Sequence, residues 1–83
     1  MKALFIFDPK ILGSEDFIRW LKNLYDMDFN FEDIEVSIKD DFMSVAGEFT
    51  LTSTALSYWI EDDDYIMIRI PHHFVKSFEV KHD

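Results

Sequence analysis

The sequence predicts an α+β fold in which one amphipathic helix packs on a mainly antiparallel sheet of about five strands, in the order β-α-β-β-β-β. Three observations lead to this class: one segment has apolar residues at helical spacing, several later segments alternate apolar with polar residues, and turn-forming residues separate them. At 83 residues, 48% of them hydrophobic and none of them cysteine, the chain is expected to form a single domain, residues 1–83, held together by its core.

The N-terminal part predicts a strand followed by the helix. Residues 3–7 are apolar at every position, so this strand is expected to lie inside the sheet and to be covered on both faces. Asp8 and Pro9 end it. Ser14 is a favourable N-cap residue, and from residue 17 to residue 24 apolar side chains recur at i, i+3, i+4 and i+7, the spacing of an amphipathic helix of about three turns.

The next two segments predict a hairpin with one solvated face. Residues 34–39 alternate between apolar and polar side chains, and so do residues 43–52. Asp40 and Asp41 lie between them, where a tight turn is expected. The sequence therefore predicts two antiparallel strands here, the second running without interruption to residue 52.

A second pair of strands is expected at residues 56–60 and 65–70, joined through four consecutive acids at residues 61–64. Pro71 ends the later strand, because proline has no backbone N–H to donate to a sheet. The tail, residues 72–83, fits both a helical turn and a strand, and we expect a turn followed by a short strand.

The negative charge of the chain is concentrated in its middle. The net charge is −9, but residues 26–64 alone carry twelve acids and one base, a net of −11, whereas each flanking segment has a net charge of +1. A field of this sign repels nucleic acid and anionic membranes, and it accelerates association with basic surfaces. We therefore expect a basic protein partner, and neither direct nucleic-acid binding nor membrane binding.

No pattern for a metal site is complete. Asp26, Asp28 and Asn30 are spaced like the first ligands of an EF-hand loop, but Phe31 and Ser37 stand where that loop needs a glycine and a bidentate glutamate. A polar loop is the simpler interpretation. We expect no metal and no cofactor.

Patterns for catalysis are also incomplete. His72 and His73 are adjacent, so on an extended chain they point to opposite faces and form a poor zinc site with His82. Glu79 and Lys81 have the E-x-K spacing of metal-dependent nucleases, but so short a pattern recurs by chance, and the negative field opposes a phosphate substrate. No glycine-rich phosphate loop or nucleophile motif occurs, so the protein is not expected to be an enzyme.

Two features bear on where the protein is found. Lys2 and the apolar run after it begin like a signal peptide, but the run ends at Phe7, before the length that such a peptide requires. No run approaches the roughly 18 apolar residues of a membrane span. The expected location is the cytoplasm.

The four acids at residues 61–64 admit two interpretations: the polar tip of a hairpin, or a surface for a partner. A tight turn needs only one or two residues, for which glycine or asparagine is better suited, and four adjacent like charges repel one another. Trp59, beside them, fits both core packing and exposure on an open sheet face. The candidate partner-binding residues are the acids of two turns and the aromatic residues beside the second: Asp40, Asp41, Tyr58, Trp59, Glu61, Asp62, Asp63, Asp64 and Tyr65.

These features favour a binding protein. The leading hypothesis is a small acidic inhibitor, a nucleic-acid mimic that occupies the basic nucleic-acid-binding surface of an enzyme or complex, because dense carboxylates resemble phosphates to Lys and Arg. Phage-encoded anti-CRISPR and antirestriction proteins are similar to it in size and charge, although no motif is shared. Two alternatives stay open: an antitoxin or immunity protein that neutralises a basic nuclease toxin, and a structural or assembly subunit that forms a homodimer through exposed strand edges.

Overall fold

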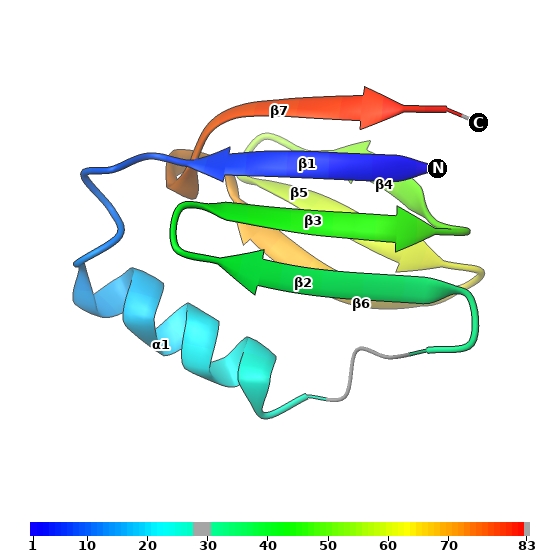
Figure 1. Ribbon diagram of the computed structural model, residues 1–83, viewed down its shortest axis with the longest axis horizontal. Helices are drawn as coiled ribbons and strands as arrows, with labels where there is room; N and C mark the ends of the chain where they lie inside the picture. Colours follow the sequence, from blue (N-terminus) through cyan, green and yellow to red (C-terminus); the bar gives the residue numbers. More distant parts are fainter. Residues whose placement is uncertain (28–30, 83) are drawn as a thin grey trace.

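In the computed structural model, two antiparallel sheets face each other and one helix lies along an edge that they share (Figure 1). The structure describes residues 1–27 and 31–82. The elements are β1 (Lys2–Phe7), α1 (Glu15–Tyr25), β2 (Ile34–Lys39), β3 (Phe42–Gly47), β4 (Thr50–Ser53), β5 (Ser57–Asp62), β6 (Tyr65–Pro71), the short 3-10 helix η1 (His72–Phe74) and β7 (Val75–Lys81).

The front sheet, as drawn in Figure 1, has the strand order β2-β3-β1-β7, and the back sheet has the order β4-β5-β6. Every neighbouring pair of strands is antiparallel. The predicted α+β class is confirmed, and so is the position of β1 inside a sheet. The predicted arrangement in one sheet of about five strands is wrong, since the described chain forms seven strands in two sheets.

The core lies between the two sheets. Burial of one large aliphatic or aromatic side chain stabilises a folded protein by roughly 1.5–3 kcal/mol. The layer of such side chains between the sheets therefore carries most of the stability. Its most deeply buried members, each at most 1% exposed, come from both sheets: Ala3, Phe5, Phe7, Met43, Val45, Ile60, Ile68 and Ile70.

The central strand β1 has two different faces. Phe5 and Phe7 are fully buried between the sheets, whereas Leu4 and Ile6 point to the opposite side and are only partly buried. No described element of the chain lies over that outer face (Figure 1). The prediction that both faces of this strand are covered is therefore wrong for the single chain.

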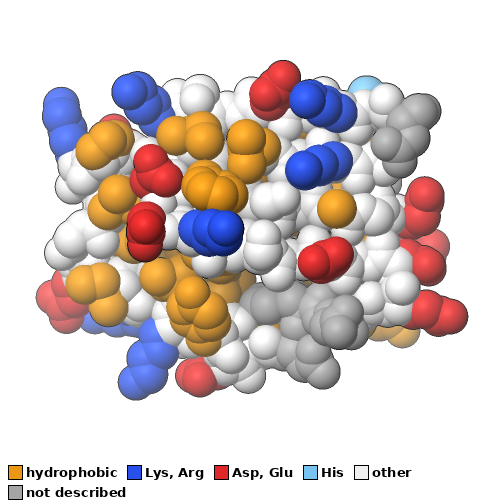
Figure 2. Space-filling model, viewed as in Figure 1, with side chains coloured by type: hydrophobic (Ala, Val, Ile, Leu, Met, Phe, Trp, Pro, Cys, Tyr) orange, Lys and Arg blue, Asp and Glu red, His pale blue; other side chains and the backbone are white. Residues whose placement is uncertain are grey.

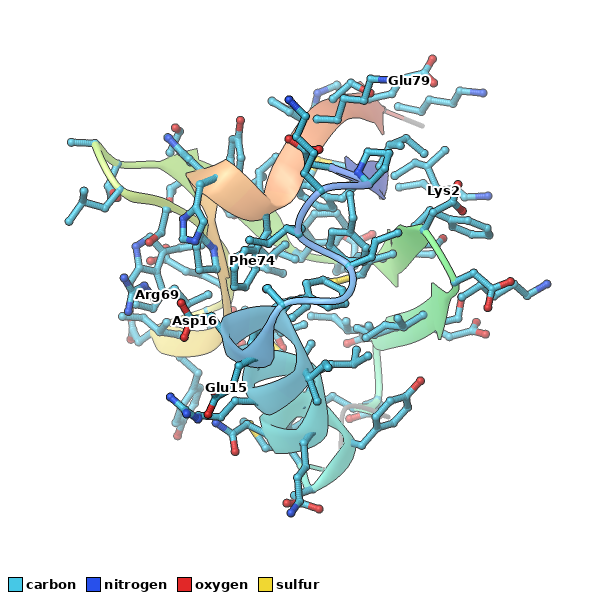
Figure 3. The ribbon with its side chains drawn as sticks, turned by 90° about the vertical axis from the view of Figure 1, so that its left-hand side faces the viewer. Lys2, Glu15, Asp16, Arg69, Phe74 and Glu79 are labelled. Atoms are coloured by element: carbon cyan, nitrogen blue, oxygen red, sulfur yellow. The ribbon has the colours of Figure 1, made fainter. Side chains whose placement is uncertain are left out.

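The helix α1 closes the edge of the sandwich between β2 and β6 (Figures 1 and 3). Its Phe17 ring lies 5.0 Å from the ring of Phe7 on β1 and 5.5 Å from the ring of Phe74 in η1. The indole Nε1 of Trp20 donates a hydrogen bond of 2.8 Å to the carbonyl oxygen of Arg69 on β6. The apolar face of the helix thus completes the core, as its spacing predicts.

The predicted start of the helix and the predicted structure of the tail are both confirmed. The hydroxyl of Ser14 accepts a hydrogen bond of 3.2 Å from the N–H of Phe17, which satisfies one of the unpaired donors at the helix N-terminus. After Pro71, which is the last residue of β6, the tail forms the turn η1 and then the edge strand β7.

The predicted hairpin is confirmed only in its first part. The turn at Asp40 and Asp41 joins β2 to β3 as expected, but the continuous strand predicted at residues 43–52 is wrong. At Gly47 the backbone takes a φ of +123°, and the chain leaves the front sheet for the back sheet. The N–H of Glu48 then donates a hydrogen bond of 2.9 Å to the carbonyl oxygen of Asp33, which fixes the corner.

Replacing Gly47 with alanine is expected to lower the free energy of unfolding by about 3 kcal/mol. A β-carbon at this position would collide with the carbonyl oxygen of Asp33, and the positive φ is unfavourable for any residue with a side chain. Gly13→Ala is the matched control, because a β-carbon there meets nothing within 4 Å, and it is expected to change stability by less than about 1 kcal/mol. Urea unfolding of both variants measures the difference, and equal stabilities would contradict the role of the corner.

Candidate protein-binding surface

The acidic run at residues 61–64 is divided between a strand end and a tight turn. Glu61 and Asp62 are the last residues of β5, and Asp63 and Asp64 form the turn to β6. Asp63 has a φ of +53°, in the left-handed region that glycine and asparagine adopt more readily than aspartate. The turn conformation alone therefore does not explain the choice of acids.

Acids from two other segments lie at the same end of the molecule. Thr50 on β4 pairs with Glu61 on β5, so the start of β4 and the segment before it lie beside the β5–β6 turn. Glu48 is in that segment, and its backbone is bonded to that of Asp33. Figure 2 shows acidic side chains along this end, on the right. We call the following set the acidic end: Glu32, Asp33, Glu48, Glu61, Asp62, Asp63 and Asp64.

The carboxylates of the acidic end have no cationic partner among the residues that the structure describes. Arg19 forms ion pairs with Glu15 at 3.0 Å and with Asp16 at 4.0 Å, both on the helix and away from this end. The seven acids form none with a described residue. Their mutual repulsion is therefore not offset within the described chain, which would lower its stability at low salt.

A shallow depression lies where the acidic end meets the neighbouring ends of β2 and β3. It has a volume of about 300 Å³, and its lining combines three acidic residues with apolar ones. A Lys or Arg side chain has the matching chemistry, an aliphatic stem that ends in a cation. The depression is lined by Phe31, Glu32, Asp33, Ile34, Glu35, Ala46 and Gly47.

The two acidic turns named in the sequence lie at opposite ends of the molecule, whose longest dimension is 32 Å. The carbonyl oxygen of Asp41 accepts a hydrogen bond of 2.8 Å from the N–H of Phe7, at the end of β1, whereas Met1 at the start of β1 lies beside Gly47. Asp40 and Asp41 therefore do not share a surface with Asp63 and Asp64.

The aromatic residues beside the acidic run face different ways. Tyr58 points between the sheets, with its ring 5.7 Å from that of Phe5. Trp59 points to the outer face of the back sheet, where it is partly buried, and it does not belong to the core. The guanidinium of Arg69 lies 5.7 Å from the Trp59 ring and its Nε donates a hydrogen bond of 2.8 Å to the hydroxyl of Ser57.

The β5–β6 hairpin also exposes apolar side chains. Tyr65 is 76% exposed and Ile66 is 62% exposed, and Ile66 pairs across the hairpin with Glu61. Large apolar side chains at such exposure next to a charged cluster are typical of protein-binding surfaces. Acids and exposed apolar side chains thus lie together on one hairpin.

Within residues 1–27 and 31–82, no three carboxylate, imidazole or thiol groups come together in a way that could hold a metal ion. Of the residues spaced like an EF-hand, Asp28 and Asn30 lie outside the described residues. His72 instead packs against Tyr58, with ring centres 4.2 Å apart, and its Nε2 lies 3.1 Å from the hydroxyl of Ser53.

Comparisons with protein-family models, with characterised proteins and with solved structures returned no significant match. In the described part of the chain, no helix combines the length and the apolar character needed to cross a membrane. Any assignment of function rests on the geometry and charge given above.

Several members of this surface are not among the candidates drawn from the sequence. Glu48 reaches the acidic end because the chain turns at Gly47, which no periodicity indicates, whereas Glu32 and Asp33 belong to the acid excess of the middle segment that the sequence already shows. Ile66 lies within the strand predicted at residues 65–70, and its exposure on the hairpin follows from its pairing with Glu61 and not from the alternation.

Glycine substitutions in the β5–β6 turn separate its conformational requirement from its charge. Asp63→Gly is expected to raise the free energy of unfolding by up to about 1 kcal/mol, because it relieves a positive φ, whereas Asp64→Gly is expected to lower it by a similar amount through added backbone freedom. Each variant removes one acid, so the charge effect cancels in the comparison. Thermal or urea unfolding measures both, and a more stable Asp64→Gly would contradict the turn geometry.

Proposed function

We propose that the protein is a small inhibitor without catalytic activity of its own, which binds the basic nucleic-acid-binding surface of an enzyme or complex through the acidic end. The observation that carries this proposal is the meeting of seven acids from three separate segments, without cationic partners among the described residues. A partner's Lys and Arg side chains would remove the repulsion among these acids. Binding is then favoured by the same charges that destabilise the free protein.

The surface offers a partner both charge and apolar contact. The unpaired carboxylates would steer a basic partner toward this end and raise the rate of association. The depression beside Phe31 would receive a Lys or Arg side chain, with its stem against the apolar lining residues and its cation at Glu32 or Asp33. Tyr65 and Ile66 would supply contact area that excludes water from the ion pairs.

A surface that evolved to bind nucleic acid is the basic surface that fits this arrangement best. Such a surface presents several Lys and Arg side chains close together, because they contact the closely spaced phosphates of a nucleic acid. The acidic end presents several carboxylates on a scaffold of paired strands. Small phage-encoded inhibitors of the anti-CRISPR and antirestriction kind belong to this functional class. An antitoxin or immunity protein that neutralises a basic nuclease toxin would use the same surface, and a toxin encoded by a neighbouring gene would favour it.

The matched variants Asp63→Asn/Asp64→Asn and Asp40→Asn/Asp41→Asn test which end binds. Each pair neutralises two adjacent acids in a two-residue hairpin turn, and asparagine accepts the positive φ of residue 63. We expect the 63/64 variant to capture the basic partner from bacterial lysate at least about tenfold less strongly at low salt, since surface charges contribute up to about 1 kcal/mol each. The 40/41 variant is expected to capture it like the original protein.

Quantitative mass spectrometry of proteins retained on each immobilised variant, through washes of rising salt, makes this comparison. Equal retention by the 63/64 variant and the original protein would remove the turn from the mechanism. Equal loss in both variants would mean that the beads act as a general ion exchanger, which contradicts a defined binding end.

A further inference from the structure

The outer face of the front sheet is an uncovered layer with an apolar centre. Leu4 and Ile6 on β1 and Phe42 on β3 form this centre, and each is only partly buried in the single chain. Figure 2 shows apolar side chains gathered over the left half of this face. We call this layer the open face, and its described members are Lys2, Leu4, Ile6, Glu35, Ser37, Lys39, Phe42, Ser44, Ala46, Ser77, Glu79 and Lys81.

Apart from Lys2 on β1, the charges of the open face lie on its two edge strands in a complementary pattern. At the end nearest the N-terminus, β2 carries Glu35 and β7 carries Lys81, in the same row of the sheet. Further along, β2 carries Lys39 and β7 carries Glu79. One edge therefore changes from negative to positive along its length and the other from positive to negative.

Lys2 and Lys81 stand directly opposite each other on β1 and β7, an arrangement that destabilises an isolated sheet. Together with Leu4 and Glu79 they line a hollow of about 100 Å³ on the open face, and Lys2 and Glu79 both project from it (Figure 3). An acid brought over this hollow would offset the repulsion between the two lysines.

We propose that the open face is covered by a second copy of this chain, related by a two-fold axis that runs parallel to the strands between β1 and β3. Such an axis sets β2 of one copy over β7 of the other. Glu35 then faces Lys81 of the second copy, and Lys39 lies diagonally across from Glu79 of the second copy. Phe42 faces Ile6 of the second copy, so the apolar centres meet and no like charges oppose each other directly.

The charge of the open face favours a second copy over the basic partner of the acidic end. The face carries three lysines and two glutamates, so it has no excess of acid that would attract a basic surface. The face has a net charge of +1, so two copies that meet here bring together none of the acid excess that gives each chain its net charge of −9. The proposal does not depend on the function of the acidic end.

The size of the face predicts a weak dimer. Four strands at about 4.8 Å spacing and six residues at about 3.4 Å give a patch of roughly 20 by 20 Å, so two copies bury on the order of 1,000 Å², at the lower end for specific interfaces. In this arrangement both acidic ends lie at the same end of the dimer. Association in the micromolar range, rather than a permanent dimer, is therefore expected.

Sedimentation velocity at protein concentrations of about 5–500 μM tests the proposal. The salt concentration is about 0.15 M, at which charges are screened beyond ~8 Å. The original protein is expected to shift from monomer to dimer with concentration, and Leu4→Lys is expected to stay monomeric although it lowers the net negative charge. Leu56→Lys makes the same substitution at a loop residue that is 73% exposed and away from the open face, and it is expected to dimerise as before. Circular dichroism confirms that each variant folds.

Charge exchange at the exposed edge strands tests the geometry without altering the apolar centre. Lys81→Glu is expected to weaken dimerisation several-fold, and the double variant Glu35→Lys/Lys81→Glu is expected to restore it. A monomer at every concentration, a dimer indifferent to Leu4→Lys, or a double variant no better than Lys81→Glu alone would overturn the proposal.

Discussion

The arrangement of this protein depends on one backbone constraint, the left-handed conformation of Gly47. The chain can leave the front sheet there only because no β-carbon stands in the way of the Asp33 carbonyl, to which the next N–H is bonded. This corner lets β3 and β4 belong to different sheets that enclose one core. It also brings Glu48 beside Asp33 and places both at the end where the β5–β6 turn lies, so the candidate site depends on the same constraint as the fold.

The sequence predicts the local structure well because local structure follows from spacing. The helix, its Ser14 cap, the Asp40–Asp41 turn and the final turn and strand are all formed as expected. The spacing of apolar residues does not reveal the division into two sheets, because Val45 before the corner and Phe49 after it are both buried in the one core. Alternation therefore continues across Gly47 although the strand does not, and only the glycine itself marks the break.

The candidate site is predicted only in part, because the sequence shows which acids are neighbours along the chain but not which segments lie side by side. The acids at residues 61–64 stand out as a run along the chain, and the charge excess of the middle segment is visible by counting. Which acids share a surface depends on the sheet pairing, which adds Glu48 to the group and separates Asp40 from it. The apolar pattern of β1 is informative in another way: it predicts two covered faces, and the single chain covers one.

In the proposed function, the acidic end occupies a surface that otherwise binds nucleic acid, and displacement of the partner by nucleic acid checks this. Proteins captured from nuclease-treated bacterial lysate on the immobilised chain would be eluted with duplex DNA or RNA, and in parallel with polyglutamate at the same concentration of charge. We expect a basic protein to be released by nucleic acid at a clearly lower concentration than by polyglutamate. Release by both polymers alike, or retention in the presence of both, would contradict it.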